Sequence, residues 1–333
     1  MYNFVKSPMS LFDTTGAELL DQSVREDHPF RIMNQLVDFD RFARRYRSLY
    51  AKIGTKGIPV EQAFRLLIIQ WLEDYSDREM ERAVQENLAV KWFAGYDLTD
   101  ATPDHSFFGK FRARLGTKHL GDIFQALNTE LHAHGLIGDT FSFVDATGIV
   151  TKTALWAERD KALAAGQQAL NNRNVNRFAA DTQARYGCKG KETYWFGYKR
   201  HLAVDMKQGI VTKVAVTPAS VTDAQALKHV IPKKGMVFAD KGYDTNEAHQ
   251  LLRQKDLHPG IIQKNNRKTK NHDRDRWLSK TRMPLEGSFS KLHRRAKYHS
   301  LKKVQFQAFA EAIVFNLKRF LVVHQLRASL VAT

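Results

Sequence analysis

The sequence predicts an α/β fold, a mixed sheet flanked by helices, preceded by an all-α N-terminal domain. From Ile32 to Leu131, apolar residues recur at three- and four-residue steps, which is the helical period. After Gly135, short β-branched and aromatic runs alternate with helical patterns. With 333 residues and 43% apolar content, the chain is long enough for two domains with real cores. We therefore predict a helical domain over residues 1–136 and a second domain over residues 137–325, followed by a tail at 326–333.

The N-terminal domain begins with residues 1 to about 30, which show no sustained period and are interpreted as an arm. Apolar stripes and start signals then predict five helices: Ile32 to Leu49, Pro59 to Leu72, a helix opened by the capping-box pattern Ser76 to Glu79 and reaching Leu88, one opened by Pro103-Asp104 and reaching Leu115, and one capped by Asp122 and reaching Leu131.

The second domain reads as strand, hairpin, helix, strand, helix, strand. In chain order the predicted elements are a strand from Thr140 to Val144 that ends at Asp145, a partly helical insertion at about 152–192 that ends in the loop Gly187 to Lys191, a hairpin of Tyr198 to Asp205 with Ile210 to Thr217, a helix capped by Asp223, a strand from Met236 to Ala239, a helix capped by Thr245 or Asn246, a short strand at Ile261-Ile262, a solvated basic loop from Lys264 to Arg276, a helix around Glu286 and a last helix from Phe306 to Phe320.

The charge balance limits the partners. The chain has 52 Lys and Arg against 35 Asp and Glu, a formal net charge of +17, which favours a polyanion: nucleic acid first, an anionic membrane surface second. The apolar runs are far shorter than the roughly 20 residues of a membrane span, so we expect no membrane segment. The N-terminus lacks a signal-peptide pattern, and the single cysteine, Cys188, cannot form an internal disulfide. Both observations predict a reducing cytoplasm.

Three acids suggest chemistry. Asp145 and Asp240 each follow a predicted strand, and Glu286 lies in a helical stretch among basic residues. Carboxylates from separate elements can hold two Mg²⁺ or Mn²⁺ ions, because these hard cations prefer oxygen ligands. Such a pair would support an in-line phosphoryl displacement on nucleic acid.

Ordinary structural roles compete with this hypothesis. With 35 acids in the chain, one at a strand end is expected by chance, and a glutamate among Lys and Arg is usually a surface ion pair. We interpret four other acids as turn or cap residues, three tryptophans as core residues, and three histidines as hydrogen-bonding or stacking groups instead of metal ligands. These are Asp139, Asp205, Asp223 and Asp244; Trp156, Trp195 and Trp277; and His201, His293 and His299.

The motifs resemble, in order along the chain, those of bacterial insertion-sequence DDE transposases, specifically the family named after insertion sequence five within the group named after insertion sequence four. The residues that carry the resemblance are Thr102-Pro103-Asp104-x-Ser106, Phe111-Arg112-x-Arg114-Leu115, Val144-Asp145-Ala146-Thr147, Gly197-Tyr198-Lys199-x-His201, Val216-Thr217-Pro218-Ala219 with Asp223, Ala239-Asp240-Lys241-Gly242-Tyr243 and Arg282-x-x-x-Glu286.

The resemblance implies a ribonuclease H-like catalytic core, with Asp145 on the first strand, Asp240 after the fourth and Glu286 on the following helix. It also implies that Arg282 contacts a DNA phosphate near the scissile bond. The family's tyrosine and lysine are replaced here by Ser279 and His293, so their roles are not carried over. Pro284 implies that the helix carrying Glu286 starts about there or bends.

The predicted function is therefore cut-and-paste DNA transposition in the bacterial cytoplasm, associated with the nucleoid. The expected partners are double-stranded DNA, as terminal inverted repeats and as target, and a second copy of the chain, giving a homodimer or larger assembly on DNA. Besides Arg282, we expect DNA-phosphate contacts from Lys241, Lys264, Arg267, Lys268, Lys270, Lys291 and Arg294. Two alternatives stay open: a non-catalytic DNA-binding protein derived from a transposase, and a metal-dependent DNA nuclease.

Overall fold

The computed structural model describes residues 15–50, 57–152, 155–190, 192–290 and 292–331. The chain divides into two compact units, residues 1–116 and 117–333. Within the described residues, no helix is both long and apolar enough to span a membrane.

The described part of the first unit contains helices and turns but no strand, which confirms the predicted all-α character. Its elements are α1 (Gly16–Ser23), α2 (Pro29–Leu36), α3 (Phe39–Arg44), the 3-10 turn η1 (Arg47–Leu49), α4 (Val60–Leu72), α5 (Asp77–Glu86), α6 (Leu88–Ala94) and the first part of α7 (His105–Ala133). Helix α4 forms the centre of this unit, and ten of its thirteen residues are buried.

Local signals explain where these helices start and stop. Ser76 and Glu79 form the predicted capping box of α5. The stripe that predicted one helix from Ile32 to Leu49 is broken, because Val37 is extended and the Asp38 side chain caps α3. The predicted arm is also wrong for residues 16–30, which are partly helical in α1 and α2.

Helix α7 is interrupted at Gly116, whose φ of 69° and ψ of 166° are not helical. Only glycine adopts such a conformation without a steric cost. The cap predicted at Asp122 is therefore wrong, since Asp122 lies inside the second part of α7. That second part belongs to the second unit.

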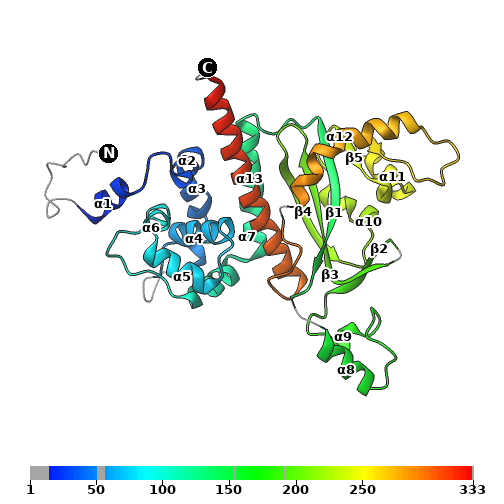
Figure 1. Cartoon of the computed structure of the whole chain (residues 1–333), viewed down its shortest axis with the longest axis horizontal. Helices are drawn as coiled ribbons and strands as arrows, with labels where there is room; N and C mark the ends of the chain where they lie inside the picture. The colour runs from blue at the N-terminus through cyan, green and yellow to red at the C-terminus, as the bar shows by residue number, and fades with distance from the viewer. Residues whose placement is uncertain (1–14, 51–56, 153–154, 191, 291, 332–333) are drawn as a thin grey trace, which may run out of the picture. The chain divides into compact units, whose positions relative to one another are not determined.

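The second unit is built on a six-stranded mixed sheet, which confirms the predicted fold class (Figure 1). The strand order is β2-β3-β1-β5-β6, and β4 also pairs with β3. The strands are β1 (Phe141–Val150), β2 (Arg185–Lys189), β3 (Thr193–Asp205), β4 (Ile210–Pro218), β5 (Met236–Ala239) and β6 (His258–Ile261); the other elements are α8 (Trp156–Ala164), α9 (Val175–Phe178), α10 (Asp223–Val230), the 3-10 turn η2 (Lys241–Tyr243), α11 (Asn246–Gln254), α12 (His272–Ser290) and α13 (Leu301–Val331).

The two faces of this sheet are covered by different helices. Val144 on β1 packs in one apolar cluster with residues of α10 and α11. Phe143, the preceding residue, points to the opposite face, where the Arg282 guanidinium of α12 lies 4.9 Å from its ring centroid. On that same face Phe238 of β5 contacts Trp277 of α12, with ring centroids 5.8 Å apart.

The outer edge of β4 is covered by α13, which lies beside the second part of α7 (Figure 1). The Asn316 side chain bonds both the amide and the carbonyl of Val211, each at 2.8 Å. The Gln305 side chain accepts a 2.7 Å hydrogen bond from the Val216 amide. Asn316 also donates to Asn128 of α7 at 2.9 Å. An edge that is covered in this way cannot pair with another chain.

Several predicted boundaries shift. The predicted loop is wrong for Gly187 to Lys189, which belong to strand β2, and Lys191 lies outside the described residues. The insertion otherwise holds α8 and α9, as predicted. Helix α12 begins at His272, inside the predicted basic loop and well before Pro284. Helix α13 continues to Val331, so the predicted tail is largely helical.

Candidate active site

Asp145 lies within β1, and Asp240 directly follows the neighbouring parallel strand β5. Strand β1 pairs in parallel with β5 from Phe141 opposite Met236 to Phe143 opposite Phe238. This offset of 95 residues (236 − 141) is also the separation of the two acids (240 − 145), so the same register continued by two residues sets Asp240 beside Asp145. Neighbouring strands are about 5 Å apart, so the two carboxylates are close.

The sequence predicted that the first strand ends at Asp145, and this is wrong. Strand β1 continues to Val150, where it pairs with β3 and forms an isolated bridge with Arg295 but no longer pairs with β5, because β5 ends at Ala239. Asp145 therefore lies on β1 at the level where the neighbouring strand β5 ends. Open α/β sheets usually bind ligands beyond the carboxyl ends of their strands.

The protonation of Asp145 reflects its surroundings. Burial raises the pKa of the Asp145 carboxyl to about 6, and the negative charges of Asp240 and Asp223 act in the same direction. The Ala146 amide, 2.8 Å from Oδ1, and the charge of Arg282 oppose this rise. Burial thus makes the ionised form of Asp145 costly, and a bound cation would offset this cost.

Arg282 approaches this site from α12. Its side chain is buried, with 8% exposed, and lies on the ring of Phe143. Phe143 and Asp145 are two residues apart on one strand, so their side chains share a face. Arginine keeps its charge when buried, so Arg282 provides a fixed positive charge beside the carboxylates.

Several polar side chains from β3, β4 and α10 lie near Asp145. Lys199 donates to Asp223 at 2.9 Å, and the fully buried His201 shares a 2.8 Å hydrogen bond with Thr217. The hydrogen bond predicted for His201 is therefore confirmed. Thr222, not Asp223, caps α10, so the predicted cap is wrong by one residue. Sequence reasoning missed the charge of Asp223 beside the site, although the motif following Val216 includes this residue.

Two family models match this chain. A model described as a transposase domain (DUF772) matches residues 18–114, and the transposase DDE domain matches residues 137–317. The second match covers more than half of the chain. This chain belongs to the family of transposases with a DDE domain. The mixed sheet and its helices agree with the ribonuclease H-like fold expected of a DDE domain.

A relative supports the assignment to the DDE transposases. The transposase for insertion sequence element IS1106 of Neisseria meningitidis serogroup B is 31% identical over 224 residues, which is 63% of this chain and 76% of that protein. No solved structure matches this chain.

Glu286, the predicted third acid, is described only in its backbone. The backbone of Glu286 lies in α12, but its side chain is outside the described residues. Among the side chains that are described, no group of three or more His, Cys, Asp or Glu residues is arranged to hold a metal ion. The structure therefore brings Asp145, Asp240 and Arg282 together and does not place the Glu286 carboxylate.

The predicted phosphate contacts of this transposase fall into different environments. Lys241 is exposed on η2, directly after Asp240. The exposed Arg294 is attached through its backbone carbonyl to Val150, five residues beyond Asp145 on β1 and hence about 17 Å along the strand. Lys291 lies outside the described residues.

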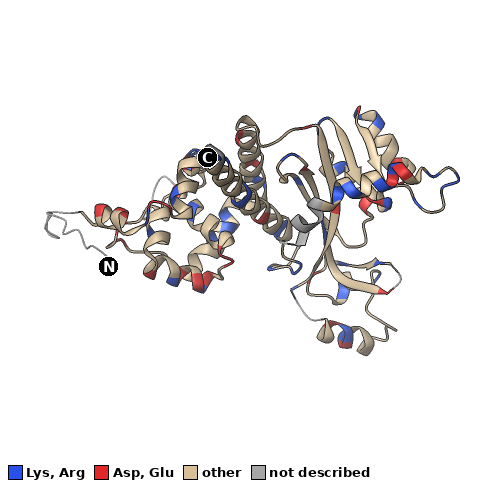
Figure 2. Cartoon of the chain, turned by 45° about the horizontal axis from the view of Figure 1, so that its top comes forward, with Lys and Arg blue, Asp and Glu red and all other residues tan. Residues whose placement is uncertain are grey.

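The other four predicted contacts lie in the basic loop, which we define as residues 262–271 between β6 and α12. Figure 2 shows Lys and Arg gathered on this loop and on the neighbouring α12. Arg267 and Lys270 form ion pairs, with Asp244 at 2.7 Å and with Asp275 at 3.8 Å respectively. The side chains of Lys264 and Lys268 form no ion pair within the described part of the chain.

The remaining assignments are mixed. Asp205 accepts the amides of Gly138 and Asp139, each at 3.0 Å, so it is a turn residue as predicted. Trp156 and Trp277 are not core residues, because 71% and 52% of their surfaces are exposed.

Proposed function

We propose that this chain cleaves DNA at the ends of an insertion sequence and joins the freed 3′-hydroxyl to target DNA. The observation that carries the proposal is the side-by-side placement of Asp145 and Asp240 where burial raises the pKa of Asp145. The family match supports phosphoryl transfer on nucleic acid as the type of chemistry. The net charge of +17 fits a DNA partner.

We propose Asp145, Asp240 and Glu286 as ligands of two Mg²⁺ or Mn²⁺ ions. The residues present fit such ions, since two adjacent carboxylates supply hard oxygen donors and carry negative charge that the protein does not neutralise. Glu286 follows Arg282 by four residues, a spacing that predicts the same side of a helix. Divalent ions bound there would activate the attacking oxygen and stabilise the leaving oxygen of the phosphodiester.

The protein's own residues would orient the DNA for this reaction. Lys241 directly follows Asp240 and Arg282 lies on α12, and the charges of both would hold the scissile phosphate. Lys264, Lys268 and Arg294 would contact phosphates farther along the duplex. In the first step water attacks the phosphorus and the bond to the 3′ oxygen breaks; in the second, the released 3′-hydroxyl attacks a target phosphorus and the equivalent bond there breaks.

We propose the finer assignments from the sequence motifs as well. These are membership of the family named after insertion sequence five, cut-and-paste movement, recognition of terminal inverted repeats or dimerisation, or both, by the helical unit, and a dimer or larger assembly that pairs two DNA ends. The name of the IS1106 relative supports an insertion sequence as the mobile element.

The test uses the full chain, Mg²⁺ or Mn²⁺, and duplex DNA that carries the sequences flanking its gene. We expect each of Asp145→Asn, Asp240→Asn and Glu286→Gln to lower the rate of end cleavage on the order of 10³-fold, which corresponds to several kcal/mol in the activation barrier, while DNA binding is retained. Asp122→Asn, which removes an exposed acid of α7, is the matched control and should cleave normally.

Cleavage retained in any of the three active-site variants would overturn the assignment. DNA binding without cleavage by the wild type would favour the non-catalytic alternative. Cleavage without joining to an added target plasmid would favour a nuclease.

A further inference from the structure

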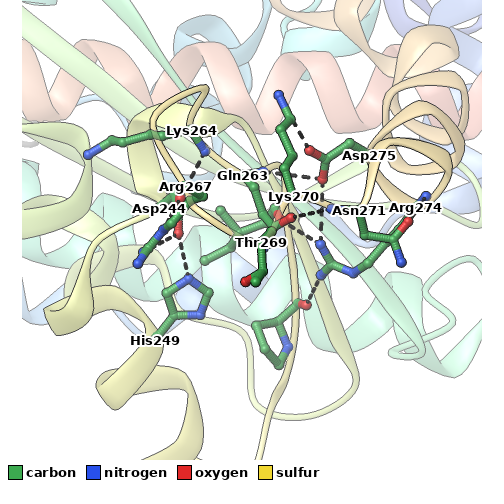
Figure 3. A network of polar contacts seen from close by, with 12 residues as sticks. Asp244, His249, Gln263, Lys264, Arg267, Thr269, Lys270, Asn271, Arg274 and Asp275 are labelled. Atoms are coloured by element: carbon green, nitrogen blue, oxygen red, sulfur yellow. Dashed lines mark hydrogen bonds and ion pairs between the residues drawn. The ribbon is translucent and has the colours of Figure 1, made fainter.

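Asp244 is a buried carboxylate four residues after Asp240, and it is surrounded by donors (Figure 3). Arg267 donates two hydrogen bonds to it, from Nε at 2.9 Å and from Nη2 at 2.7 Å. The Lys264 amide donates at 2.9 Å, and His249 Nε2 lies 2.9 Å from Oδ1. The bonds from Arg267, then those from Lys264 and His249, hold the pKa of Asp244 well below its usual range.

Asp240 and Asp244 are the two ends of one rigid turn. The Asp240 carboxylate accepts the Gly242 amide at 2.8 Å, and its carbonyl accepts the Tyr243 amide at 3.1 Å. The Asp244 amide donates to the carbonyl of Lys241 at 3.2 Å. Tyr243 is fully buried in the cluster between the sheet, α10 and α11. The position of Asp244 relative to Asp240 is therefore fixed by this turn.

The base of the basic loop is closed by Gln263. Its side chain accepts the Asn271 amide at 3.0 Å and donates to the Thr269 carbonyl at 3.4 Å (Figure 3). Its own amide donates to Asp275 of α12 at 3.2 Å. The loop is thus held at its base by Gln263 and along its length by Asp244.

The ion pairs divide the loop cations into two kinds. Arg267 is neutralised by Asp244, and Lys270 is engaged by Asp275 and by Asn265. The Lys264 side chain extends away from Asp244, although the amide of the same residue binds it (Figure 3). Lys264 and the exposed Lys268 are left to attract an external anion.

We propose that Asp244 is a positioning residue, which fixes the basic loop to the turn that carries Asp240 so that Lys264 and Lys268 hold the DNA backbone at a set place relative to the catalytic carboxylates. Arg267 serves as the anchor of the loop and not as a phosphate contact. This inference rests on the proposed function, because it concerns the DNA of the same reaction.

The decisive variant is Asp244→Asn, which keeps the size of the side chain and removes its charge. A DNA strand misplaced by about 1 Å can cost on the order of 10²-fold in rate, so the cleavage rate at saturating DNA should fall about 10- to 100-fold. DNA affinity should stay within about threefold of wild type or become tighter, because the variant has one more net positive charge.

Asp273→Asn is the matched control. It removes an acid from the first turn of α12. The Asp273 side chain is 94% exposed and lies 3.6 Å from Arg276, and within the described residues it does not contact the loop base. It should change DNA affinity in the same direction and leave the cleavage rate unchanged. Normal cleavage by Asp244→Asn, or an equal loss in Asp273→Asn, would overturn the positioning role.

A double-mutant cycle separates the two roles of Arg267. As an anchor, Arg267→Gln should slow cleavage as Asp244→Asn does, and the double variant should be no slower than the slower single variant. Arg267→Lys, which keeps the charge but loses the paired hydrogen bonds, should be intermediate. Multiplicative losses, together with weaker DNA binding by Arg267→Gln alone, would show a direct phosphate contact and overturn the anchor role.

Trypsin provides a readout that does not depend on transposition. The loop contains four Lys or Arg sites, at 264, 267, 268 and 270. Without DNA, Asp244→Asn should be cut in the loop at least about tenfold faster than wild type or Asp273→Asn, since its loop opens more often. Equal cutting would refute the anchor even if the chain is a transposase, whereas faster cutting with no wild-type transposition would refute only the proposed function. Circular dichroism would establish that the variant is folded.

Discussion

The half-buried Asp145 and the buried Asp244 lie near the same turn, but their carboxylates have different surroundings. Asp145 accepts one backbone hydrogen bond and lies beside the negative charge of Asp240, and burial raises its pKa to about 6. Asp244 is bound by Arg267, by a backbone amide and by a histidine, and the pKa of its carboxyl is lowered. A charge that is already compensated serves structure, while one left uncompensated is suited to an external cation.

The largest expected effect concerns the cost of the uncompensated charge. The difference between a pKa of about 6 and the ordinary 3.8 corresponds to about 3 kcal/mol of destabilisation at neutral pH. Asp145→Asn should therefore stabilise the metal-free protein at pH 8, measured as chemical unfolding in EDTA. Below pH 3.8 the carboxyl is protonated in both the folded and the unfolded protein, so it costs no stability there. The cost develops as the pH rises from 3.8 through 6, so the stability gain of Asp145→Asn should vanish near pH 4.

Asp122→Asn is the control for this measurement, since it removes an exposed carboxylate of the same unit. It should leave the free energy of unfolding unchanged at both pH values. An Asp145→Asn variant less stable than wild type at pH 8 would mean that the carboxylate is already compensated.

Divalent cations should offset the same cost of the buried Asp145 charge. At a Mg²⁺ or Mn²⁺ concentration 100 times the dissociation constant, binding to the native state adds about 2.7 kcal/mol of stability. Thermal unfolding should show this gain in wild type and in Asp244→Asn, and it should be lost in Asp240→Asn. An equal gain in all three proteins would place the cation elsewhere.

Asp244→Asn should have the opposite effect on stability to Asp145→Asn. Loss of its charge-assisted bonds should destabilise the protein at neutral pH by about 1–2 kcal/mol, a modest value because the Arg267 side chain is 40% exposed. A lowered pKa stabilises the fold above 3.8 and loses this contribution as the pH falls, so the deficit should narrow in acid. A deficit that widens in acid would contradict the assignment.

Local patterns predicted five of the six strands of the sheet, including those that carry or precede Asp145 and Asp240. The β-branched runs before Asp145 and Asp240 mark buried strands, and their separation matches the observed register. The strand at Arg185–Lys189 was missed because it has no apolar alternation; pairing with β3 specifies it. The break at Gly116 agrees with the predicted end of a helix at Leu115, but the next helix was predicted to begin too late, at Asp122, because no capping-box pattern marks its start directly after Gly116.

Contacts between distant parts of the chain could not be predicted. Asp244 was interpreted as a turn or cap residue, and nothing local links it to Arg267, which comes 23 residues later (267 − 244). Charge counting likewise treated all cations of the basic loop as equal. Which of them are neutralised depends on how the loop closes, and this is a tertiary property.

The smallest expected effect tests that division within the loop. Lys264→Gln removes a charge with no ion pair among the described residues, so it should weaken DNA binding a few-fold and reduce the salt slope of log K by about 0.9. Lys270→Gln removes the same charge from a side chain that Asp275 and Asn265 already engage, so its slope should change by less than half as much. Fluorescence anisotropy with one duplex from 50 to 200 mM salt would compare them. Equal slopes would mean that the ion pairs open when DNA binds, and the contrast between compensated and uncompensated charge would then not extend to the DNA-bound protein.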